Sequence, residues 1–370
     1  MKIAIFTPYH IFLSGGVNEH ATNQAEILRK LGHDVTILTP RPRDSKSQDS
    51  PKGVVFLGGS TRMKTPSATS VDFSATLDNE AIDAELDKGY DIIHVHEPLV
   101  PIAARQLLAR AEGRALRVGT FHAALPGNTI GKSLVSTYKQ YAKAVLPHVD
   151  VITAVTPAAI GFIGDYTDLP INYIPNGIRS ELYKYVETER DENMVFFVGR
   201  LEKRKGARQL LKAFIELKKL KPEATLKIAG TGPLTRSLTA FVKDRNIQDV
   251  EFLGYIDDET KIDYMSRCGI YTSPALYGES FGIVLAEAMA MQAPIVAHPN
   301  DGYSWVLQET GRISLVDCKD PVEYAQRMQL MMEDDGIRKA WQKWAKEYVK
   351  QFDYNKIVAT YDKLYKDNLK

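Results

Sequence analysis

The chain has 370 residues, more than the roughly 250–300 at which a single hydrophobic core stops growing, so we expect two domains. Apolar residues make up 44% of the chain and charged residues 25%, which is typical of a globular protein and excludes a disordered or fibrous one. The formal net charge is +1, so no overall field attracts nucleic acid, and any anion site has to be local.

The cysteines and the apolar runs bear on where the protein works. Cys268 and Cys318 are the two cysteines, and neither stands in a CxxC or Cys/His spacing, which argues against structural zinc and a secreted disulfide framework. No run reaches the ~18 apolar residues of a spanning helix, and the apolar start MKIAIFTPYH is too short for a signal peptide. We therefore expect a cytoplasmic protein that is able to touch the inner face of a membrane.

Apolar strands alternate with helices through the first half of the chain. Apolar residues recur at helical spacing from Val17 to Leu31, and Gly32 ends this helix. Strands with few polar residues, separated by helices, are typical of a parallel sheet covered on both faces. The predicted strands are 2–8, 35–40, 91–97, 117–123 and 149–156, and further helices are predicted near 101–112 and 130–146.

The same alternation resumes at residue 194 and predicts a second α/β domain. Residues 175–192 carry proline, glycine and charge without clear periodicity, so we place a linker there. Ligands of open α/β sheets bind beyond the carboxyl ends of the strands, which directs attention to the loops there. The predicted strands are 194–200, 225–230, 250–256, 270–275 and 294–298, and the helices are 207–220, 234–245, 259–267 and 282–291.

Two glycine-containing segments were considered for phosphate binding. Gly15 and Gly16 stand immediately before a helix, whose free N–H groups favour a phosphate or a sugar oxygen, although such a turn alone is a weak signal. No GxGxxG follows the first strand, and GTGPLT at 230–235 lacks the third glycine. The hypothesis of an enzyme that transfers hydride with a dinucleotide cofactor therefore loses its main support.

Charged residues cluster in two segments of the second domain. Between Gly199 and Gly206, four cations occur within six positions at a strand end, which indicates a diphosphate clamp or, alternatively, a solvated basic loop. Glu279 and Glu287 straddle a helix N-terminus. Helical spacing would separate their Cα atoms by ~12 Å, whereas the carboxyls of a retaining hydrolase pair lie within ~5.5 Å. We therefore expect the two carboxylates to grip two ends of one long ligand.

Histidines end two strands of the first domain. His122 follows a strand, where it is either structural or placed for chemistry. His94 and His96 alternate on one strand and could suggest a metal pair. No D-x-D occurs, which removes the usual sequence support for a metal-bound nucleotide diphosphate.

Together these motifs resemble the retaining enzymes of glycosyltransferase family 4. The resemblance is carried in order by GGV (15–17), FH (121–122), PNG (175–177), GR followed by RKG (199–206) and GESFGIVLAEAMA (278–290). It covers almost the whole chain, and IHVHEPLVP, GTFHA and FLGYIDDETK look most similar to the phosphatidylinositol mannosyltransferase group. The implied fold is GT-B: α/β, with two Rossmann-like domains, 1–174 and 193–345, facing across a cleft, and residues 346–370 packing back on the N-terminal domain.

The resemblance implies a nucleotide-sugar donor held mainly by the second domain. Arg200 and Lys205 would neutralise the diphosphate, Glu279 would bind the transferred sugar, and Glu287 would bind the ribose. His122 would lie by the sugar and leaving group, so that His122 and Glu279 are the catalytic candidates. Further donor-binding residues would be Gly15, Gly16, Ile256, Asp258, Lys261, Ser280, Phe281, Gly282 and Ile283, and the acceptor side would include Tyr9 and Asn18.

The donor and mechanism follow from the same resemblance. A carboxylate at Asp258 suits guanine, whose N1 and N2 both donate, so GDP-mannose is the first choice and UDP-glucose or another UDP-sugar the second. No residue is a clear nucleophile, which favours same-face attack with retention over a covalent intermediate. No cofactor or metal ion is expected, because fixed cations and helix-end N–H groups would stabilise the departing diphosphate.

The acceptor side departs from the lipid-modifying relatives. Residues 71–91 contain seven acidic residues and one basic residue, Lys88, whereas the phosphatidylinositol mannosyltransferase group has a basic helix in this region. Gly127 stands near the position at which that group has a lysine. Lys132, Lys139 and Lys143 instead fall along one line of a helix. This stripe predicts weak peripheral contact with anionic membrane, and hence a lipid-linked or polyol acceptor such as phosphatidylinositol, unless it is only a solvated outer face.

Two other function classes remain open at this stage. A non-hydrolysing sugar-nucleotide epimerase also has two Rossmann domains and would release an epimerised donor without an acceptor. A nucleotide-sugar sensor without catalysis would keep Arg200 and Lys205 but would not need His122.

Overall fold

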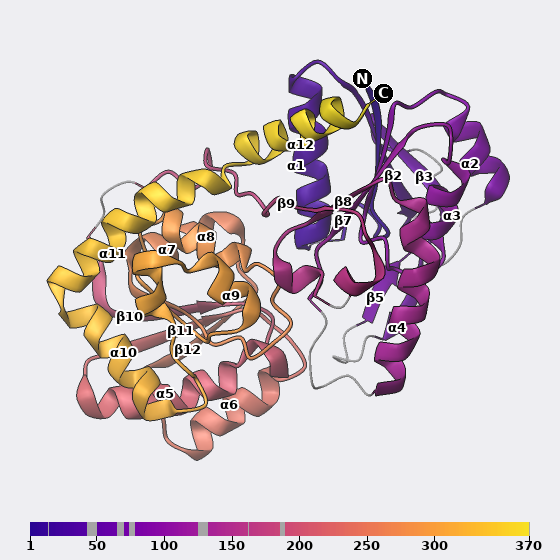
Figure 1. The fold of residues 1–370 in the computed structure, drawn as a ribbon. Helices are drawn as coiled ribbons and strands as arrows, with labels where there is room; N and C mark the ends of the chain where they lie inside the picture. Colours follow the sequence, from indigo (N-terminus) through magenta and orange to yellow (C-terminus); the bar gives the residue numbers. More distant parts are fainter. Residues whose placement is uncertain are drawn as a thin grey trace. The chain divides into compact units, whose positions relative to one another are not determined.

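The computed structural model describes residues 1–13, 15–42, 50–64, 70–73, 78–124, 132–161, 163–185 and 189–369. Contacts divide the chain into two units. Unit 1 comprises Met1–Gly177 with Tyr354–Lys370, and unit 2 comprises Ile178–Asp353. Each unit has a parallel sheet packed between helices (Figure 1), as the alternation of apolar strands and helices predicts.

Unit 1 contains a seven-stranded sheet in the order β3-β2-β1-β6-β7-β8-β9, with parallel pairing throughout. The strands are β1 (Lys2–Phe6), β2 (Asp34–Arg41), β3 (Val54–Gly59), β6 (Ile92–His96), β7 (Leu116–Phe121), β8 (Val151–Ala154) and β9 (Ile171–Tyr173). A separate antiparallel hairpin joins β4 (Thr61–Lys64) to β5 (Ser70–Phe73). The reversal of strand order between β1 and β6 is the point at which doubly wound sheets hold ligands.

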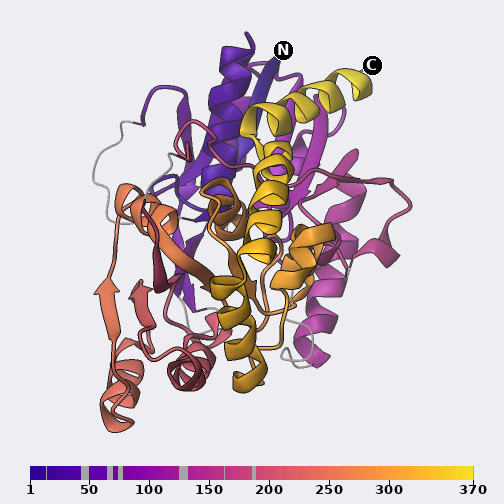
Figure 2. The same ribbon diagram turned by 90° about the vertical axis from the view of Figure 1, so that its left-hand side faces the viewer.

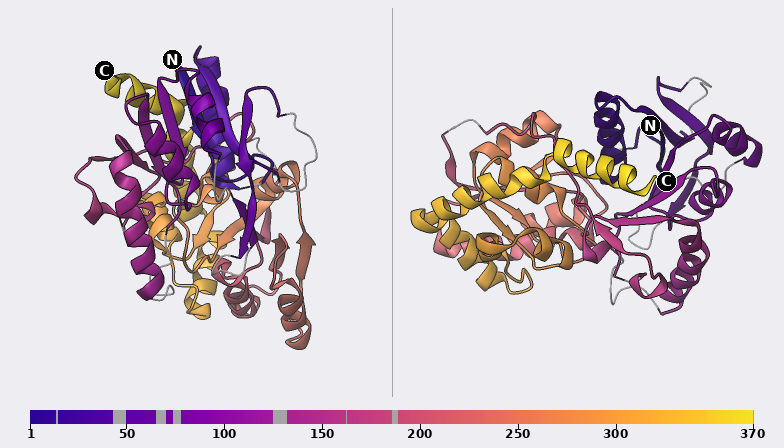
Figure 3. Two further views of the ribbon diagram at one scale, coloured as in Figure 1. Left: turned by 90° about the vertical axis from the view of Figure 1, so that its right-hand side faces the viewer. Right: turned by 45° about the horizontal axis from the view of Figure 1, so that its top comes forward.

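The helices of unit 1 lie on both faces of this sheet (Figure 1). On one face are α1 (Gly16–Lys30) and α12 (Tyr354–Asn368), and on the other are α2 (Asn79–Leu86), α3 (Ala103–Arg110) and α4 (Lys132–Val145). Figures 2 and 3 show α12, drawn in yellow, alongside α1, drawn in indigo.

The last helix of the chain belongs to the core of unit 1. Ile357, Val358, Tyr361 and Tyr365 of α12 are buried in one cluster with residues of β1 and α1. Burying such side chains contributes about 1.5–3 kcal/mol each, so α12 is an integral part of this unit. The sequence prediction has residues 346–370 return as one segment, whereas contacts assign the residues from Tyr354 onward to unit 1.

Unit 2 contains a five-stranded parallel sheet in the order β12-β11-β10-β13-β14. Its strands are β10 (Asp191–Val198), β11 (Thr225–Ala229), β12 (Val250–Gly254), β13 (Cys268–Ser273) and β14 (Ile295–Ala297). The helices α5 (Ala207–Leu220), α6 (Thr235–Asp244) and α10 (Pro321–Glu333) lie opposite α7 (Asp258–Arg267) and α8 (Ile283–Ala290) in Figure 1. The unit also includes α9 (Asp301–Val306) and α11 (Asp335–Tyr348).

Candidate functional site

Three loops at the carboxyl edge of the unit 2 sheet carry most of the residues that the motifs single out. The loop after β10 holds Arg200–Gly206, the loop after β12 leads into α7, and the loop after β13 leads into α8. In a parallel sheet these loops emerge at the same edge, which is where ligands of such folds bind.

The loops after β10 and β13 are joined by a four-residue ionic cluster. Arg204 donates from Nε to Glu202 Oε1 at 2.5 Å and from Nη1 to Glu279 Oε1 at 2.5 Å. Lys205 Nζ lies 2.7 Å from the same Glu279 oxygen. Burial opposes the charge on Arg204, yet the carboxylates of Glu279 and Glu202 hold the pKa of its guanidinium above the usual value. We refer to Glu202, Arg204, Lys205 and Glu279 as the ionic cluster.

This cluster changes two of the assignments made by motif. Lys205 is paired with Glu279 in this structure, so a diphosphate would have to draw the lysine away from the carboxylate or share it. Arg200 is half exposed, with Nε 4.0 Å from Glu202 Oε2, so its guanidinium is open to an incoming anion. Arg204, for which the motifs indicate no separate role, holds Glu279 in place.

Gly206 sets the geometry of the cluster at the start of α5. Its φ of 72° is in the left-handed region, and a Cβ there would lie 2.0 Å from the carbonyl oxygen of Pro274. The chain therefore passes close to the end of β13 only because this residue has no side chain. That approach places Arg204 and Lys205 beside the loop that carries Glu279.

We expect Gly206→Ala to destabilise unit 2 far more than Gly254→Ala. Both glycines have φ near 70°, where a side chain costs roughly 1–2 kcal/mol, but a Cβ on Gly254 meets nothing within 4 Å. Trp305, Trp341 and Trp344 all belong to unit 2, so tryptophan emission during urea unfolding reports on this unit. Equal shifts of the midpoint in the two variants would contradict the close approach to Pro274.

Glu287 lies on α8 with one carboxylate oxygen satisfied and the other not. Oε1 accepts a hydrogen bond from Tyr183 Oη at 2.5 Å and pairs with Lys261 Nζ at 2.9 Å. Among the described residues, the buried Oε2 has no hydrogen-bond partner. A buried carboxylate oxygen is normally hydrogen-bonded, so Oε2 is suited to accept from a ligand hydroxyl. Tyr183 is a site residue that the motifs did not indicate.

The two adjacent aspartates at the start of α7 have different tasks. Asp257 caps the helix by accepting from the backbone N–H of Thr260 at 2.8 Å, and hydrogen bonds from the side chain and the backbone of Thr260 lower the pKa of its carboxyl. Asp258 is 78% exposed and lies 3.0 Å from Lys261 Nζ. Both aspartates are exposed, but the side chain of Asp257 is engaged in capping α7, and the half-buried Ile256 precedes the pair.

The turn from β13 into α8 presents main-chain groups more than side chains. Gly278 and Gly282 have φ of 74° and 89°, and Gly282 caps α8. The Phe281 ring is buried against Phe352 and Trp305, so this residue has only its main chain to offer a ligand. Ser280 and Ile283 are half-buried at the same turn.

In unit 1, the turn before α1 is open. Gly15 precedes the helix with an extended φ of 165°, and a Cβ on it would meet nothing within 4 Å. Neither the backbone nor the packing requires glycine at Gly15, which leaves close approach of a ligand as a reason for it. Gly16 is the first residue of α1, where the N–H groups are free of helical partners.

Asn18 has a structural task that the acceptor-side prediction did not include. Its Nδ2 donates to the carbonyls of His10 and Leu13, both at 2.9 Å, and its Oδ1 accepts from Thr7 Oγ1 at 2.7 Å. Both amide protons are therefore used to hold the loop after β1. Tyr9 is half-buried and accepts at its carbonyl from Thr39 Oγ1.

His122 lies in a buried cluster of polar side chains in unit 1. Its backbone N–H donates to Glu97 Oε1 at 2.8 Å, and its Nε2 lies 2.8 Å from His96 Nδ1. Burial, together with the neighbouring histidines, holds the pKa of His122 and of His96 well below 6.5. His94 and His96 stack with ring centroids 4.4 Å apart and bond to protein groups, so they do not form the metal pair considered from the sequence.

One group of potential metal ligands occurs among the described residues. His298, Asp317 and Cys318 bring their donor atoms within 4.8 Å of one another. The Cys318 thiol donates to the carbonyl of Pro274, its backbone N–H donates to His298 Nδ1, and burial raises the thiol pKa to about 12. These groups satisfy one another, and no role for a metal follows from them.

The acidic region 71–91 is partly neutralised by the neighbouring helix. Asp83 of α2 forms an ion pair with Arg110 of α3, and Asp87 forms one with Arg114 just after it. Gly127 and the side chain of Lys132 lie outside the described residues. In the part of the chain that the structure describes, no helix is both long enough and apolar enough to cross a bilayer.

Comparisons with known proteins bear on the family of the chain. Residues 14–182 match the model of Glycosyltransferase Family 4, and residues 180–348 match that of Glycosyl transferases group 1. A phosphatidyl-myo-inositol mannosyltransferase of Propionibacterium freudenreichii subsp. shermanii is 31% identical over 316 residues, covering 80% of this chain and 77% of that protein. One of Mycolicibacterium smegmatis is 28% identical over 375 residues, covering 99% and 93%.

A solved structure extends the comparison to the fold. Anabaena HepE in complex with UDP and glucose superposes with a TM-score of 0.74 at 17% identity, covering 99% of this chain and 100% of that one. Both sheets, the loops at their carboxyl edges and the family models thus lead to one conclusion: the chain is a glycosyltransferase of family 4 with the GT-B fold of two Rossmann-like units.

Proposed function

We propose that this glycosyltransferase moves a hexose from a nucleotide sugar to a lipid-linked or polyol acceptor, with retention of the anomeric configuration. The observation that carries the donor side is Glu287, whose buried Oε2 is an acceptor suited to a ribose hydroxyl. The half-exposed Arg200 and the lysine of the ionic cluster supply positive charge for the diphosphate at the same sheet edge.

The chemistry requires stabilisation of a departing nucleoside diphosphate. Arg200, Lys205 and the N–H groups at the start of α8 favour that negative charge. Glu279 would contact the transferred sugar while Arg204 and Lys205 hold its carboxylate. Same-face attack, with the leaving phosphate taking the acceptor proton, needs no protein nucleophile.

Turnover should therefore not depend on a divalent metal. We expect the rate in excess EDTA to equal that in magnesium or manganese, because the protein's cations take the place of the ion. Initial rates of nucleotide release, with and without chelator, check this. Activity that disappears in EDTA and returns with added metal would contradict it.

GDP-mannose is the proposed donor, and a UDP-sugar is the alternative. Relatives of the whole chain are named mannosyltransferases, and a carboxylate such as that of the exposed Asp258 suits the donor groups of guanine. HepE, a structural neighbour, is described with UDP and glucose. Nucleotide release from GDP-mannose, UDP-glucose, UDP-galactose and UDP-GlcNAc, with and without phosphatidylinositol, tests donor and acceptor together. Release only from a UDP-sugar would overturn the first choice.

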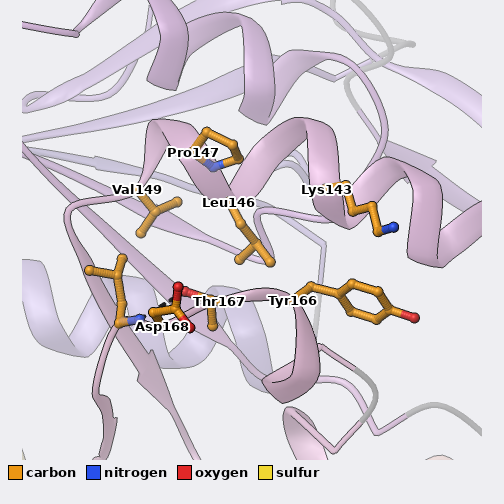
Figure 4. Close-up of a pocket in the computed structure, with 8 residues that line it drawn as sticks. Lys143, Leu146, Pro147, Val149, Tyr166, Thr167 and Asp168 are labelled. Carbon is orange, nitrogen blue, oxygen red and sulfur yellow. Dashed lines mark hydrogen bonds between the residues drawn. The ribbon is translucent and has the colours of Figure 1, made fainter.

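The acceptor side is proposed to touch an anionic membrane weakly. Lys139 and Lys143 of α4 lie 5.9 and 5.2 Å from the ring centroid of Tyr166. Figure 4 shows Lys143 and Tyr166 at the rim of a pocket of about 780 Å³, which Asp168 and apolar side chains also line. The aromatic ring thus gathers two cations at one place on the unit 1 surface.

We expect Lys139→Glu/Lys143→Glu to reduce binding to anionic vesicles at low salt. Each lysine near a membrane contributes about 1 kcal/mol, so the wild-type contact should be weak and salt-sensitive. Sedimentation with phosphatidylserine vesicles measures it, and Lys339→Glu/Lys346→Glu on α11 is the control of equal charge change. If both double variants bind like the wild type, α4 has no role in membrane contact.

A further inference from the structure

A continuous chain of buried side chains connects His122 to the C-terminal helix within unit 1. His122 Nε2 lies 2.8 Å from His96 Nδ1, and His96 Nε2 lies 3.0 Å from Gln24 Oε1. On its other side, Gln24 Nε2 donates to Tyr365 Oη at 2.8 Å. All four side chains are 0–5% exposed, so water does not compete for these bonds.

The chain continues from Tyr365 to a backbone carbonyl. Tyr365 Oη lies 2.5 Å from His94 Nδ1, and His94 Nε2 lies 2.6 Å from Thr120 Oγ1. Thr120 is hydrogen-bonded to Thr153, whose hydroxyl donates to the carbonyl of Gly119 at 3.4 Å. A carbonyl oxygen only accepts hydrogen bonds. The carbonyl of Gly119 therefore fixes which partner donates in each bond of this series of hydrogen-bonded side chains.

The position of every proton follows from that end. Thr153 donates to Gly119 and therefore accepts from Thr120, which in turn accepts from His94 Nε2–H. His94 Nδ1 then has no proton and accepts from the Tyr365 hydroxyl, whose oxygen accepts from the Gln24 amide. The carbonyl oxygen of Gln24 is thereby turned toward His96.

The same reasoning fixes the two remaining rings. Gln24 Oε1 only accepts, so His96 carries its proton on Nε2, and its bare Nδ1 accepts from His122 Nε2–H. Burial keeps both rings neutral by lowering their pKa values well below 6.5, so each has one proton to place. His122 is left with Nδ1 unprotonated.

We propose that Gln24 is a positioning residue: acting through His96, it fixes His122 in the Nε2–H tautomer, so that His122 offers the donor sugar a hydrogen-bond acceptor. This rests on the proposed function, in which His122 serves the sugar and leaving group. A hexose hydroxyl that donates to Nδ1 fits this tautomer, whereas a ligand group that only accepts does not. An amide is suited to the task because its two ends differ, one accepting and one donating.

The test measures the tautomer directly, on the protein without ligand. In protein with ¹⁵N-labelled histidine, the ring-nitrogen shifts of His122, assigned by comparison with His122→Ala, report which nitrogen carries the proton. We expect Nε2 protonated in the wild type and a mixture of tautomers in Gln24→Leu. Tyr365→Phe removes the nearer acceptor of the Gln24 amide and leaves only the 3.2 Å contact with His94 Nδ1, so it should mix the tautomers as well, to a smaller extent. This variant serves if Gln24→Leu does not fold.

Tyr361→Phe is the matched control. Tyr361 lies one turn earlier on α12 and is equally buried. Its hydroxyl meets the threonine end of the hydrogen-bonded chain, at 3.4 Å from Thr120 and beside Thr153, and not the histidines next to His122, so its loss should leave the His122 spectrum unchanged. Sugar transfer should fall by roughly tenfold or more in Gln24→Leu, as expected for a histidine in the wrong tautomer, and stay near the wild-type rate in Tyr361→Phe.

The outcomes separate the two proposals. Protonation at Nδ1 of wild-type His122, or an unchanged spectrum in both Gln24→Leu and Tyr365→Phe, would overturn the assignment of Gln24. A tautomer that shifts as expected while His122→Ala retains full transfer activity would instead refute the role of His122 in the proposed function.

Discussion

Unit 1 should lose roughly 3 kcal/mol of stability between pH 7 and pH 5.5, while unit 2 loses much less. The cause is the cluster of four buried histidines at the carboxyl ends of β6 and β7 and on α1. Burial lowers the pKa of His20 to about 4 and that of His94 to about 3, and the pKa values of His96 and His122 are also well below 6.5.

The sign of the effect follows from where the protons bind. In the unfolded chain each histidine takes up a proton near pH 6.5, whereas the folded unit does so only at much lower pH, so acid favours the unfolded chain. The stability is fully present above pH 6.5 and decreases as the pH falls toward the folded values. Four such groups would account for about 5 kcal/mol at pH 5.5 relative to pH 7.

Glu97 works in the opposite direction. Burial raises the pKa of its carboxyl to about 7, against the hydrogen bonds from the backbone N–H groups of His122 and Ala123. As the pH falls, the folded unit therefore gains a proton on Glu97 before the unfolded chain does. This uptake restores between about 1 and 2 kcal/mol of the stability of unit 1 at pH 5.5. The tyrosines that α12 packs against the cluster stay neutral over this range, so the histidines dominate.

Hydrogen exchange of α1, β6 and β7 as a function of pH measures the effect, and tryptophan emission follows unit 2 in the same samples. His20 offers a matched variant, because its ring packs against those of His96 and His122 and takes no part in the hydrogen bond between them. His20→Phe should remove about a quarter of the histidine contribution, whereas His148→Gln, outside the cluster, should leave the pH dependence unchanged. If the amides of unit 1 are equally protected from exchange at pH 7 and pH 5.5, the prediction that the buried histidines stay neutral in the folded unit is wrong.

The sequence was sufficient for the two parallel sheets, because buried strands such as 194–200 and 294–298 are apolar on both faces over most of their length. Strands at the sheet edges were harder to find. Val54–Gly59 is partly exposed, Ile171–Tyr173 is three residues long, and neither was predicted. Their pairing with β2 and β8 comes from tertiary neighbours, which local periodicity does not report.

The site could be predicted as a set of loops but not as a set of contacts. The motifs led to Arg200, Lys205, Glu279 and Glu287, yet nothing in their spacing showed that Arg204 and Lys205 would share one oxygen of Glu279. Gln24 had no signal at all, since a lone glutamine on a helix is usually exposed. Its task follows from the packing of α1, β6 and α12, which brings residues 24, 96 and 365 together.

Replacing Glu279 by glutamine should separate sugar transfer from nucleotide binding. Transfer should fall by a factor on the order of 10²–10³, as for the loss of one group that stabilises the reacting sugar. The affinity for the free nucleoside diphosphate should be unchanged or higher, because Glu279 no longer neutralises Lys205 and the lysine gains freedom to meet the phosphates.

Glu202→Gln is the control that isolates the sugar contact. Glu202 and Glu279 both bind Arg204 at 2.5 Å and both are largely buried, so either substitution removes one negative charge from the ionic cluster. Only Glu279 also holds Lys205 and occupies the loop into α8, so only its loss should reduce the turnover number severely. Calorimetry with GDP and UDP, combined with initial rates, measures both quantities. If the two variants lose transfer equally, Glu279 acts by holding the cluster together, and its proposed contact with the sugar is wrong.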